Sequence, residues 1–167
     1  MREQFNQDWL KIAKEEAYHF SLLNHHLNVL GYQYGDFPAQ NDLWTMAVKT
    51  SYDPLVRMAL VPRLLEARGL DVTPGIIEKL KVAGDEKAAA ILGIIFRDEL
   101  IHVQIGNKWY LHLCELRKSD PLTTFKSLLQ RFAPGYLRAP MEREARLQAG
   151  FSEAELQYFD QLIEEEV

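Results

Sequence analysis

The chain has a single cysteine, and it lacks basic blocks and long apolar runs. Cys114 cannot form a disulfide within the chain, which suits a reducing compartment. The net charge is -5 at pH 7, and no basic cluster indicates nucleic acid as the main partner. No apolar run reaches the length of a membrane span, and no charged-then-apolar leader opens the sequence. We therefore expect a soluble, cytoplasmic protein with neither a nucleic-acid nor a membrane partner.

Alternation of apolar and polar residues typical of β-strands is also absent, and helical periodicity fills most of the 167 residues. The length and the 47% share of hydrophobic residues are sufficient for a packed core. Apolar residues recur at steps of three and four, which predicts an all-α fold. The predicted helices cover about 4–30, 42–51, 55–68, 73–82, 86–117, 122–132 and 141–148, with one more after 152.

Local signals mark where several of these helices begin and end. Asp53-Pro54 reads as an N-cap followed by proline at the first helical position, and Thr73-Pro74 reads as another start. Asp85 caps the longest predicted helix, and Ser152-x-x-Glu155 is a capping box. We expect the helix before Thr73 to end at Gly69, with a bend at its internal Pro62.

Two short stretches, Lys14–Phe20 and Arg97–Val103, each carry Glu-x-x-His within a helical pattern. Residues three apart share one helix face, so Glu16 points with His19 and Glu99 points with His102. Both pairs interrupt seams that are otherwise apolar. Burying an unpartnered carboxylate costs roughly several kcal/mol, and a bound metal is one way to offset that cost. The alternative is that the Glu and His side chains face solvent, which suits one such pair better than two matched ones.

Glu66 adds a third carboxylate, in the largely apolar helix that contains Pro62. Di-iron carboxylate bundles use one Glu from each of two helices and Glu-x-x-His from each of the other two. Carboxylate and imidazole ligands suit two iron ions or an iron/manganese pair, with zinc as a substitute. The five predicted metal ligands are Glu16, His19, Glu66, Glu99 and His102.

The segment from Trp9 to Asn107 resembles a ferritin-like family of bacterial proteins of unknown function. The stretches that carry the resemblance are Asp8–Phe20, Tyr34–Ala39, Arg57–Pro74 and Arg97–Glu99 with His102. The resemblance implies a ferritin-like helical bundle whose members have an additional N-terminal helix with a further Glu. From the resemblance we expect that helix to be missing from the present sequence. Three explanations stay open: the chain is truncated, a second copy (a homo-oligomer) or a partner subunit supplies the helix, or water completes a five-ligand site.

Two acidic residues beside the predicted ligands are expected to orient them. Asp98 resembles the Asp that hydrogen-bonds a ligand His on the facing helix in related di-iron enzymes. We predict that Asp98 binds His19 and that Glu15 binds His102. Glu15 is not itself a good ligand, because it lies about 100° round the helix from Glu16.

The leading functional hypothesis is a non-haem di-iron, or iron/manganese, oxidoreductase that activates dioxygen on an unidentified small molecule. The alternatives are a ferroxidase or iron-handling protein, and a non-catalytic helical module with an incomplete metal site. We divide the chain into a ferritin-like bundle, residues 1–118, and a C-terminal helical extension, residues 119–167, packed on it. Arg57, Arg63 and Arg68 are expected to pair with acidic surface residues.

Overall fold

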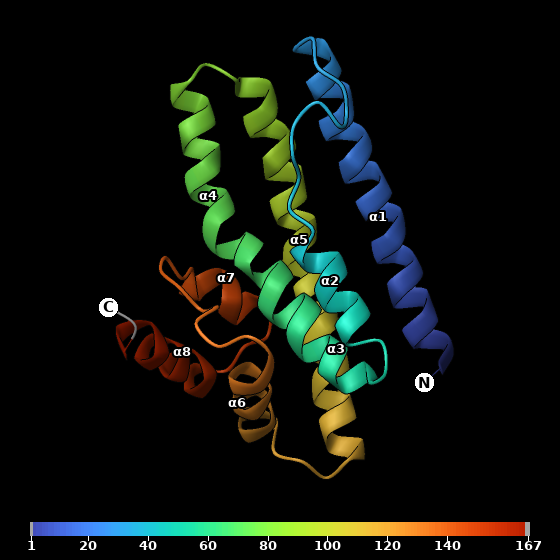
Figure 1. The fold of residues 1–167 in the computed structure, drawn as a ribbon, viewed down its shortest axis with the longest axis vertical. Helices are drawn as coiled ribbons and strands as arrows, with labels where there is room; N and C mark the ends of the chain where they lie inside the picture. Colours follow the sequence, from blue (N-terminus) through green and yellow to red (C-terminus); the bar gives the residue numbers. More distant parts are fainter. Residues whose placement is uncertain (1, 166–167) are drawn as a thin grey trace. The chain divides into compact units, whose positions relative to one another are not determined.

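A computed structural model describes residues 2–165, and this range is helical, with no strand. The all-α prediction is confirmed. Figure 1 shows the elements in chain order. They are α1 (Arg2–Val29), α2 (Asp42–Lys49), α3 (Pro54–Leu60), the π-helical segment η1 (Val61–Glu66), α4 (Ala67–Val82), α5 (Glu86–Leu116), α6 (Pro121–Phe132), α7 (Arg143–Gln148) and α8 (Glu153–Glu165).

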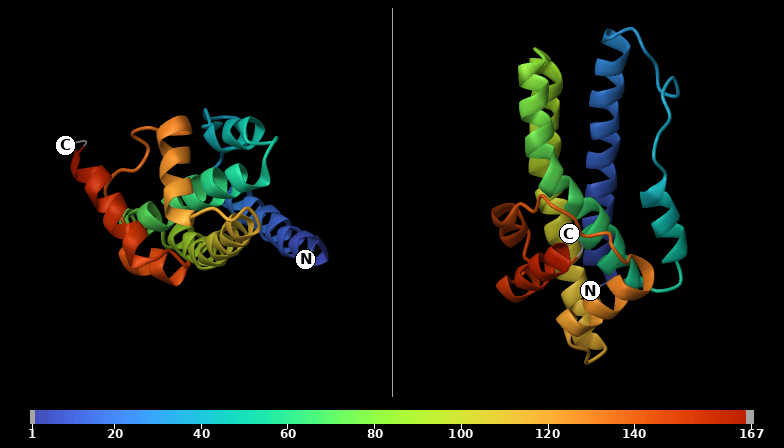
Figure 2. Two further views of the ribbon diagram at one scale, coloured as in Figure 1. Left: turned by 90° about the horizontal axis from the view of Figure 1, so that it is seen from below. Right: turned by 60° about the vertical axis from the view of Figure 1, so that its left-hand side comes forward.

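The helices form two compact units, and the first contains the residues up to Asn41 together with Thr73–Asp98. In this unit α1, the later part of α4 and the early part of α5 lie side by side (Figures 1 and 2). His26 on α1 lies 2.9 Å from the Asp85 carboxylate. The other Asp85 oxygen accepts the Ala88 N–H at 2.9 Å, so the predicted N-cap of α5 is confirmed.

The second unit contains Asp42–Val72 and the residues from Glu99 onward. Here α3 contacts α2 and α6, and η1 contacts α2. Fully buried Leu60, Leu64, Tyr110, Phe125 and Phe159 form much of the core of this unit. The helices after residue 118 therefore share a core with the segment from Asp42 to Val72. The predicted domain boundary at residue 118 stays a prediction.

Short-range helix signals agree with the structure. Asp53 accepts the Leu55 N–H and Pro54 is the first residue of α3, as predicted. The capping box is also present, because Glu155 accepts the Ser152 N–H at 2.8 Å and donates its own N–H to the Ser152 hydroxyl. Both motifs depend on residues two or three positions apart, which the sequence alone specifies.

The predicted helix end at Gly69 and the new start at Thr73-Pro74 are wrong, because α4 runs unbroken from Ala67 to Val82 with Pro74 inside it. Leu70 and Asp71 are buried in the turn before the proline. Arg146 holds Asp71 with two hydrogen bonds of 2.9 and 2.7 Å. These tertiary contacts stabilise helical backbone where local preference favours a break.

Pro62 lies within a π-helical turn, and the Ala67 N–H donates to the Pro62 carbonyl five residues earlier. Single π-helical turns inside α-helices are uncommon and are frequent at functional sites. On α5, a Cβ added to Gly106 would lie 2.4 Å from the Pro62 Cβ, which is closer than real atoms approach. Gly106 therefore allows α5 to approach this turn closely.

The arginines expected at the surface bind other groups. Arg63 is 1% exposed and forms a buried ion pair with Glu155 of α8. Arg57 donates to the Ala47 carbonyl at 2.5 Å, and Arg68 donates to three successive carbonyls at 138–140. The expected pairing with acidic surface residues is wrong, because the carboxylates beside Arg63 and Arg68, those of Glu155 and Asp71, are both buried. Glu155 is 92 positions from Arg63, so a local pattern does not reveal it. Among the described helices, none is both long and apolar enough to cross a membrane.

Candidate metal centre

The first Glu-x-x-His pair lies in the middle of α1. The His19 ring is buried, with 5% of its side chain exposed, whereas half of the Glu16 side chain, 51%, is exposed. His19 Nδ1 and Glu16 Oε2 are 3.7 Å apart. This distance is too long for a direct hydrogen bond. The two atoms therefore face each other across a short gap.

Asp98 on α5 holds the other side of the His19 ring. Its Oδ2 lies 3.1 Å from His19 Nε2, so the predicted hydrogen bond is present. Burial raises the pKa of Asp98, but hydrogen bonds from His19 and Arg97 outweigh it and hold that pKa below its ordinary value. An ionised carboxylate can only accept, so Nε2 carries the proton and donates it. In neutral His19, the lone pair is then on Nδ1, the atom that faces Glu16.

The second pair repeats this geometry on α5. His102 Nδ1 and Glu99 Oε2 are also 3.7 Å apart. The side chains are better covered than in the first pair, with 1% of His102 and 18% of Glu99 exposed. In both pairs the imidazole Nδ1 is a buried atom directed toward the carboxylate three residues earlier.

Glu99 follows Asp98 directly in helix α5. One ligand atom each from Glu16, His19 and Glu99 lie within 4.8 Å of one another. Donors each roughly 2.1 Å from one ion stand about 3.0–3.6 Å apart at angles of 90–120°. The 3.7 Å within each pair is close to this spacing. The oxygen and nitrogen donors and their separations therefore fit a metal such as iron, manganese or zinc.

Glu66 is the last residue of η1, and one of its carboxylate oxygens is buried. It is not among the three residues of the group above, and neither is His102. Within the second unit, Pro62 lies against Gly106, and η1 and α5 run in opposite directions (Figure 1). Pro62 is four residues before Glu66, and Gly106 is four residues after His102. We therefore infer that Glu66 lies at the level of His102.

Glu15 forms an ion pair of 3.8 Å with Lys11 one turn earlier on α1. Its predicted bond to His102 stays a prediction.

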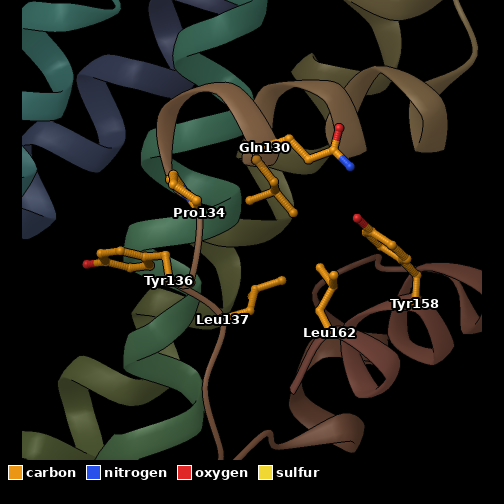
Figure 3. Close-up of a pocket in the computed structure, with 9 residues that line it drawn as sticks. Gln130, Pro134, Tyr136, Leu137, Tyr158 and Leu162 are labelled. Atoms are coloured by element: carbon orange, nitrogen blue, oxygen red, sulfur yellow. The ribbon is translucent and has the colours of Figure 1, made fainter. Parts of the chain in front are cut away.

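A cavity of about 240 Å³ lies elsewhere in the second unit, between the end of α6, the loop after it and α8. Figure 3 shows Leu137 and Leu162 facing one another across it, with Gln130 and the Tyr158 hydroxyl at its edge. None of the five predicted ligands lines this cavity. It is therefore a feature of the C-terminal helices and not of the candidate centre.

Residues 1–157 match a protein family described as "Protein of unknown function (DUF455)". The chain belongs to this family. An uncharacterized protein of Haemophilus influenzae is 50% identical over 154 residues, which cover 92% of this chain and 54% of that relative. The chain thus spans about half the length of the relative. No solved structure matches.

The sequence reading missed two buried ion pairs near Glu66, Arg63 with Glu155 and Asp71 with Arg146. A signal for the first was available, because Arg63 interrupts the apolar segment from Leu55 to Leu65. A charged residue inside such a segment requires a buried partner. Nothing local identifies that partner 92 residues away in the chain.

Proposed function

We propose that the protein is a ferritin-like di-metal carboxylate protein that binds two iron ions, or iron and manganese, and acts as an oxidoreductase. The observation that carries the proposal is the repeated Glu/His pair, with its 3.7 Å donor separation on both helices. The Asp98 hydrogen bond to His19 supports it further, because metal-binding imidazoles characteristically donate their other N–H to a carboxylate.

In this proposal Glu16, Glu66 and Glu99 supply carboxylate oxygens, and His19 and His102 each supply Nδ1. Two bound iron ions would supply the redox capacity to activate dioxygen for oxidation of a small organic molecule. Asp98 keeps the proton of His19 on Nε2, so that the Nδ1 lone pair stays available to bind a metal ion. The burial of both imidazoles restricts the access of bulk water to the ligand atoms.

We propose further that a helix outside this chain completes the centre, from a second copy or from another segment or subunit. Glu16 is half exposed, and Phe20 and Leu23, four and seven residues later on the same face, are also exposed. A carboxylate flanked by exposed apolar side chains is suited to cover by an amphipathic helix. The relative's extra length leaves room for such a segment in the family.

Metal stoichiometry tests the centre itself. The purified chain is loaded with Fe²⁺ without oxygen, or with Mn²⁺, desalted, and analysed by elemental mass spectrometry. We expect His19→Ala and Glu99→Ala to lose most of the bound metal. His26→Ala is the matched control, because His26 is also on α1 and also hydrogen-bonded to an aspartate. Less than about 0.2 metal per wild-type chain would reject the proposal for this ligand count.

The oxidoreductase part requires a separate measurement. Ferrous protein that consumes oxygen repeatedly in the presence of a reductant, and more slowly as the Glu99→Ala variant, supports it. Consumption that stops after one oxidation of the loaded iron would favour iron handling instead. Light scattering then decides between storage in a shell and a smaller assembly.

A further inference from the structure

Glu66 is the last residue of η1, and a buried charged residue lies on each side of it in the sequence. Arg63 lies three residues before it and Asp71 five residues after it, and both are almost fully covered. Each binds a partner from the last two helices. The C-terminal helices thus hold the backbone on both sides of Glu66.

The Arg63 guanidinium contacts one buried carboxylate and three aromatic rings. Its Nη2 donates to Glu155 Oε1. The carbon of the guanidinium lies 4.2 Å from the centre of the Tyr110 ring, 4.6 Å from that of Phe125 and 5.0 Å from that of Phe151. Contacts with three rings and an ion pair with a buried carboxylate restrict rotation of the side chain.

The second tie joins α4 and α7. Arg146 donates to both oxygens of Asp71, and Asp71 also accepts the Glu142 N–H at 3.1 Å. On α5, Asn107 donates to the Ala149 carbonyl at 2.6 Å, at the end of α7. Helix α7 therefore contacts α4, which follows Glu66 directly in the chain, and α5, which carries Glu99 and His102.

A π-helical turn is less favourable than an α-helical turn and persists only where its surroundings enforce it. Relaxation to α-helix would change the number of residues per turn and rotate Glu66 relative to Arg63. With Arg63 held by Glu155, that rotation is opposed. The buried pair thus fixes the direction of a carboxylate that is not itself part of the pair.

We propose that Arg63 and Glu155, supported by Asp71 and Arg146, are positioning residues that hold Glu66 toward the metal. This inference rests on the proposed metal centre. A purely stabilising role would be a poor explanation of the pair, because apolar residues of similar volume often stabilise a core as well as a buried ion pair does. Apolar side chains would select the π-helical conformation of η1 less specifically than a directional ion pair does.

The test is the double variant Arg63→Met/Glu155→Gln in the full chain. Gln keeps the capping box with Ser152, and Met fills the aromatic surroundings without leaving an unpaired charge. The affinity for Mn²⁺ is measured by electron paramagnetic resonance of the free ion, and the thermal midpoint is measured in parallel. The matched control is Arg143→Met/Asp160→Asn, an ion pair between α7 and α8 whose partners are 40% and 44% exposed.

We expect the double variant to melt near the wild type and to bind Mn²⁺ at least about tenfold more weakly, while the control is unchanged. In a Glu66→Ala background the same double change should have no further effect on affinity, because the pair acts through Glu66. Should the double variant not fold, Glu155→Gln alone, with the same comparison in the Glu66→Ala background, gives the answer.

Two results would overturn the inference while leaving the centre intact. One is Mn²⁺ affinity within twofold of the wild type in the folded double variant. The other is an equal loss of affinity with and without Glu66. A wild-type chain that binds no Mn²⁺ would reject the proposed function, and this inference with it.

Discussion

His19 shows how a single contact determines what an imidazole can do. Its Nε2 hydrogen-bonds to Asp98, so the other nitrogen, Nδ1, faces Glu16 with a lone pair that can bind a metal ion. His26, one heptad later on the same helix, has its Nε2 on Asp85, but that carboxylate caps a helix and no Glu lies three residues before it. The two histidines share one kind of partner and differ in what lies on the other side of the ring.

Removal of the Asp98 carboxylate should weaken metal binding without removing a ligand. For Asp98→Ala we expect about 10–100-fold lower affinity for Mn²⁺, because the His19 ring loses its orientation and its fixed tautomer. Titration followed by electron paramagnetic resonance measures this. Arg97→Gln is the control, since Arg97 donates to Asp98 Oδ1, whereas His19 lies beside Oδ2. Unchanged affinity in Asp98→Ala would show that the ring is held by other contacts.

Asp53 should give the stability a defined pH dependence. The hydrogen bonds from Arg117, opposed by burial and supported by the Leu55 N–H, hold its pKa below the ordinary 3.8. A lowered carboxyl pKa contributes stability above the ordinary value, and this contribution is lost as the pH falls through the folded value. Because Arg117 is 45% exposed, we expect Asp53→Asn to cost only about 0.5–1 kcal/mol at pH 7.

Urea unfolding of wild type and Asp53→Asn at several pH values checks this prediction. The difference in unfolding free energy should disappear as the pH is lowered below 3.8. A difference that stays constant across that range would assign the effect to the helix cap and not to the charge.

Which single-residue features could be predicted follows from the range of their interactions. Asp53, Asp85 and the Ser152–Glu155 pair act on backbone groups within three residues, so their roles were readable in the sequence. The sequence shows that Arg63 is a charged residue in an apolar segment, but it does not identify the partner, Glu155, which lies far along the chain. The Asp98 bond to His19 was predictable only because the two Glu-x-x-His pairs already indicated that their helices face each other.

At the scale of helices, Gly106 sets how closely α5 approaches η1. Gly106→Ala would place a Cβ against the ring of Pro62, which cannot rotate away, so we expect a loss of about 1–3 kcal/mol in unfolding free energy. Gly93→Ala is a control in the same helix, where an added Cβ has nothing within 4 Å. That change should raise stability by up to about 1 kcal/mol. Equal effects in urea unfolding would contradict the close approach.

Arg146 joins α7 to α4, and its loss should be severe. Among the residues that the structure describes, Arg146→Ala leaves the buried Asp71 with Arg68, at 3.5 Å, as its one cationic partner. Breaking a buried pair costs about 3–5 kcal/mol. Arg143 lies in the same helix but pairs with the exposed Glu153 and Asp160, so Arg143→Ala should lower the unfolding free energy by less than about 1 kcal/mol. Denaturant unfolding measures both, and similar losses would show that burial of the Arg146 pair does not matter.

The errors in helix boundaries have the same origin as these energies. Local preference predicted a break before Thr73, but contacts with α7 stabilise the turn at Leu70 and Asp71, and α4 continues. Pro62 was expected to cause a bend, and the chain accommodates it as a π-helical turn next to Gly106. In both cases the backbone follows the packing of a distant helix, which no window of neighbouring residues contains.

At the scale of the molecule, the exposed face of α1 around Glu16 predicts association. We expect the chain to form larger species in a concentration-dependent way, as measured by light scattering. Leu23→Ser should reduce this association, because Leu23 lies on the Glu16 face. Leu10→Ser is the matched control, since Leu10 is more exposed but lies about 120° from that face. Association unaffected by Leu23→Ser would place the interacting surface elsewhere.

The all-α fold was predictable because helical periodicity extends over nearly the whole chain. The ferritin-like arrangement and the metal ligands rest on the spacing of Glu and His residues together with a family resemblance. That spacing correctly indicated that Glu16, His19 and Glu99 come near one another. It could not indicate the half-exposed state of Glu16, which depends on what covers α1.

Glu155 divides its two oxygens between separate tasks: Oε2 caps α8 and Oε1 neutralises Arg63. The capping of α8 and the burial of the Arg63 guanidinium thus depend on the same side chain. Because one carboxylate serves both, we expect backbone amides at the beginning of α8 and those of η1 to exchange with deuterium at a common rate. We therefore expect the first turn of α8 to open as slowly as the turn that carries Glu66.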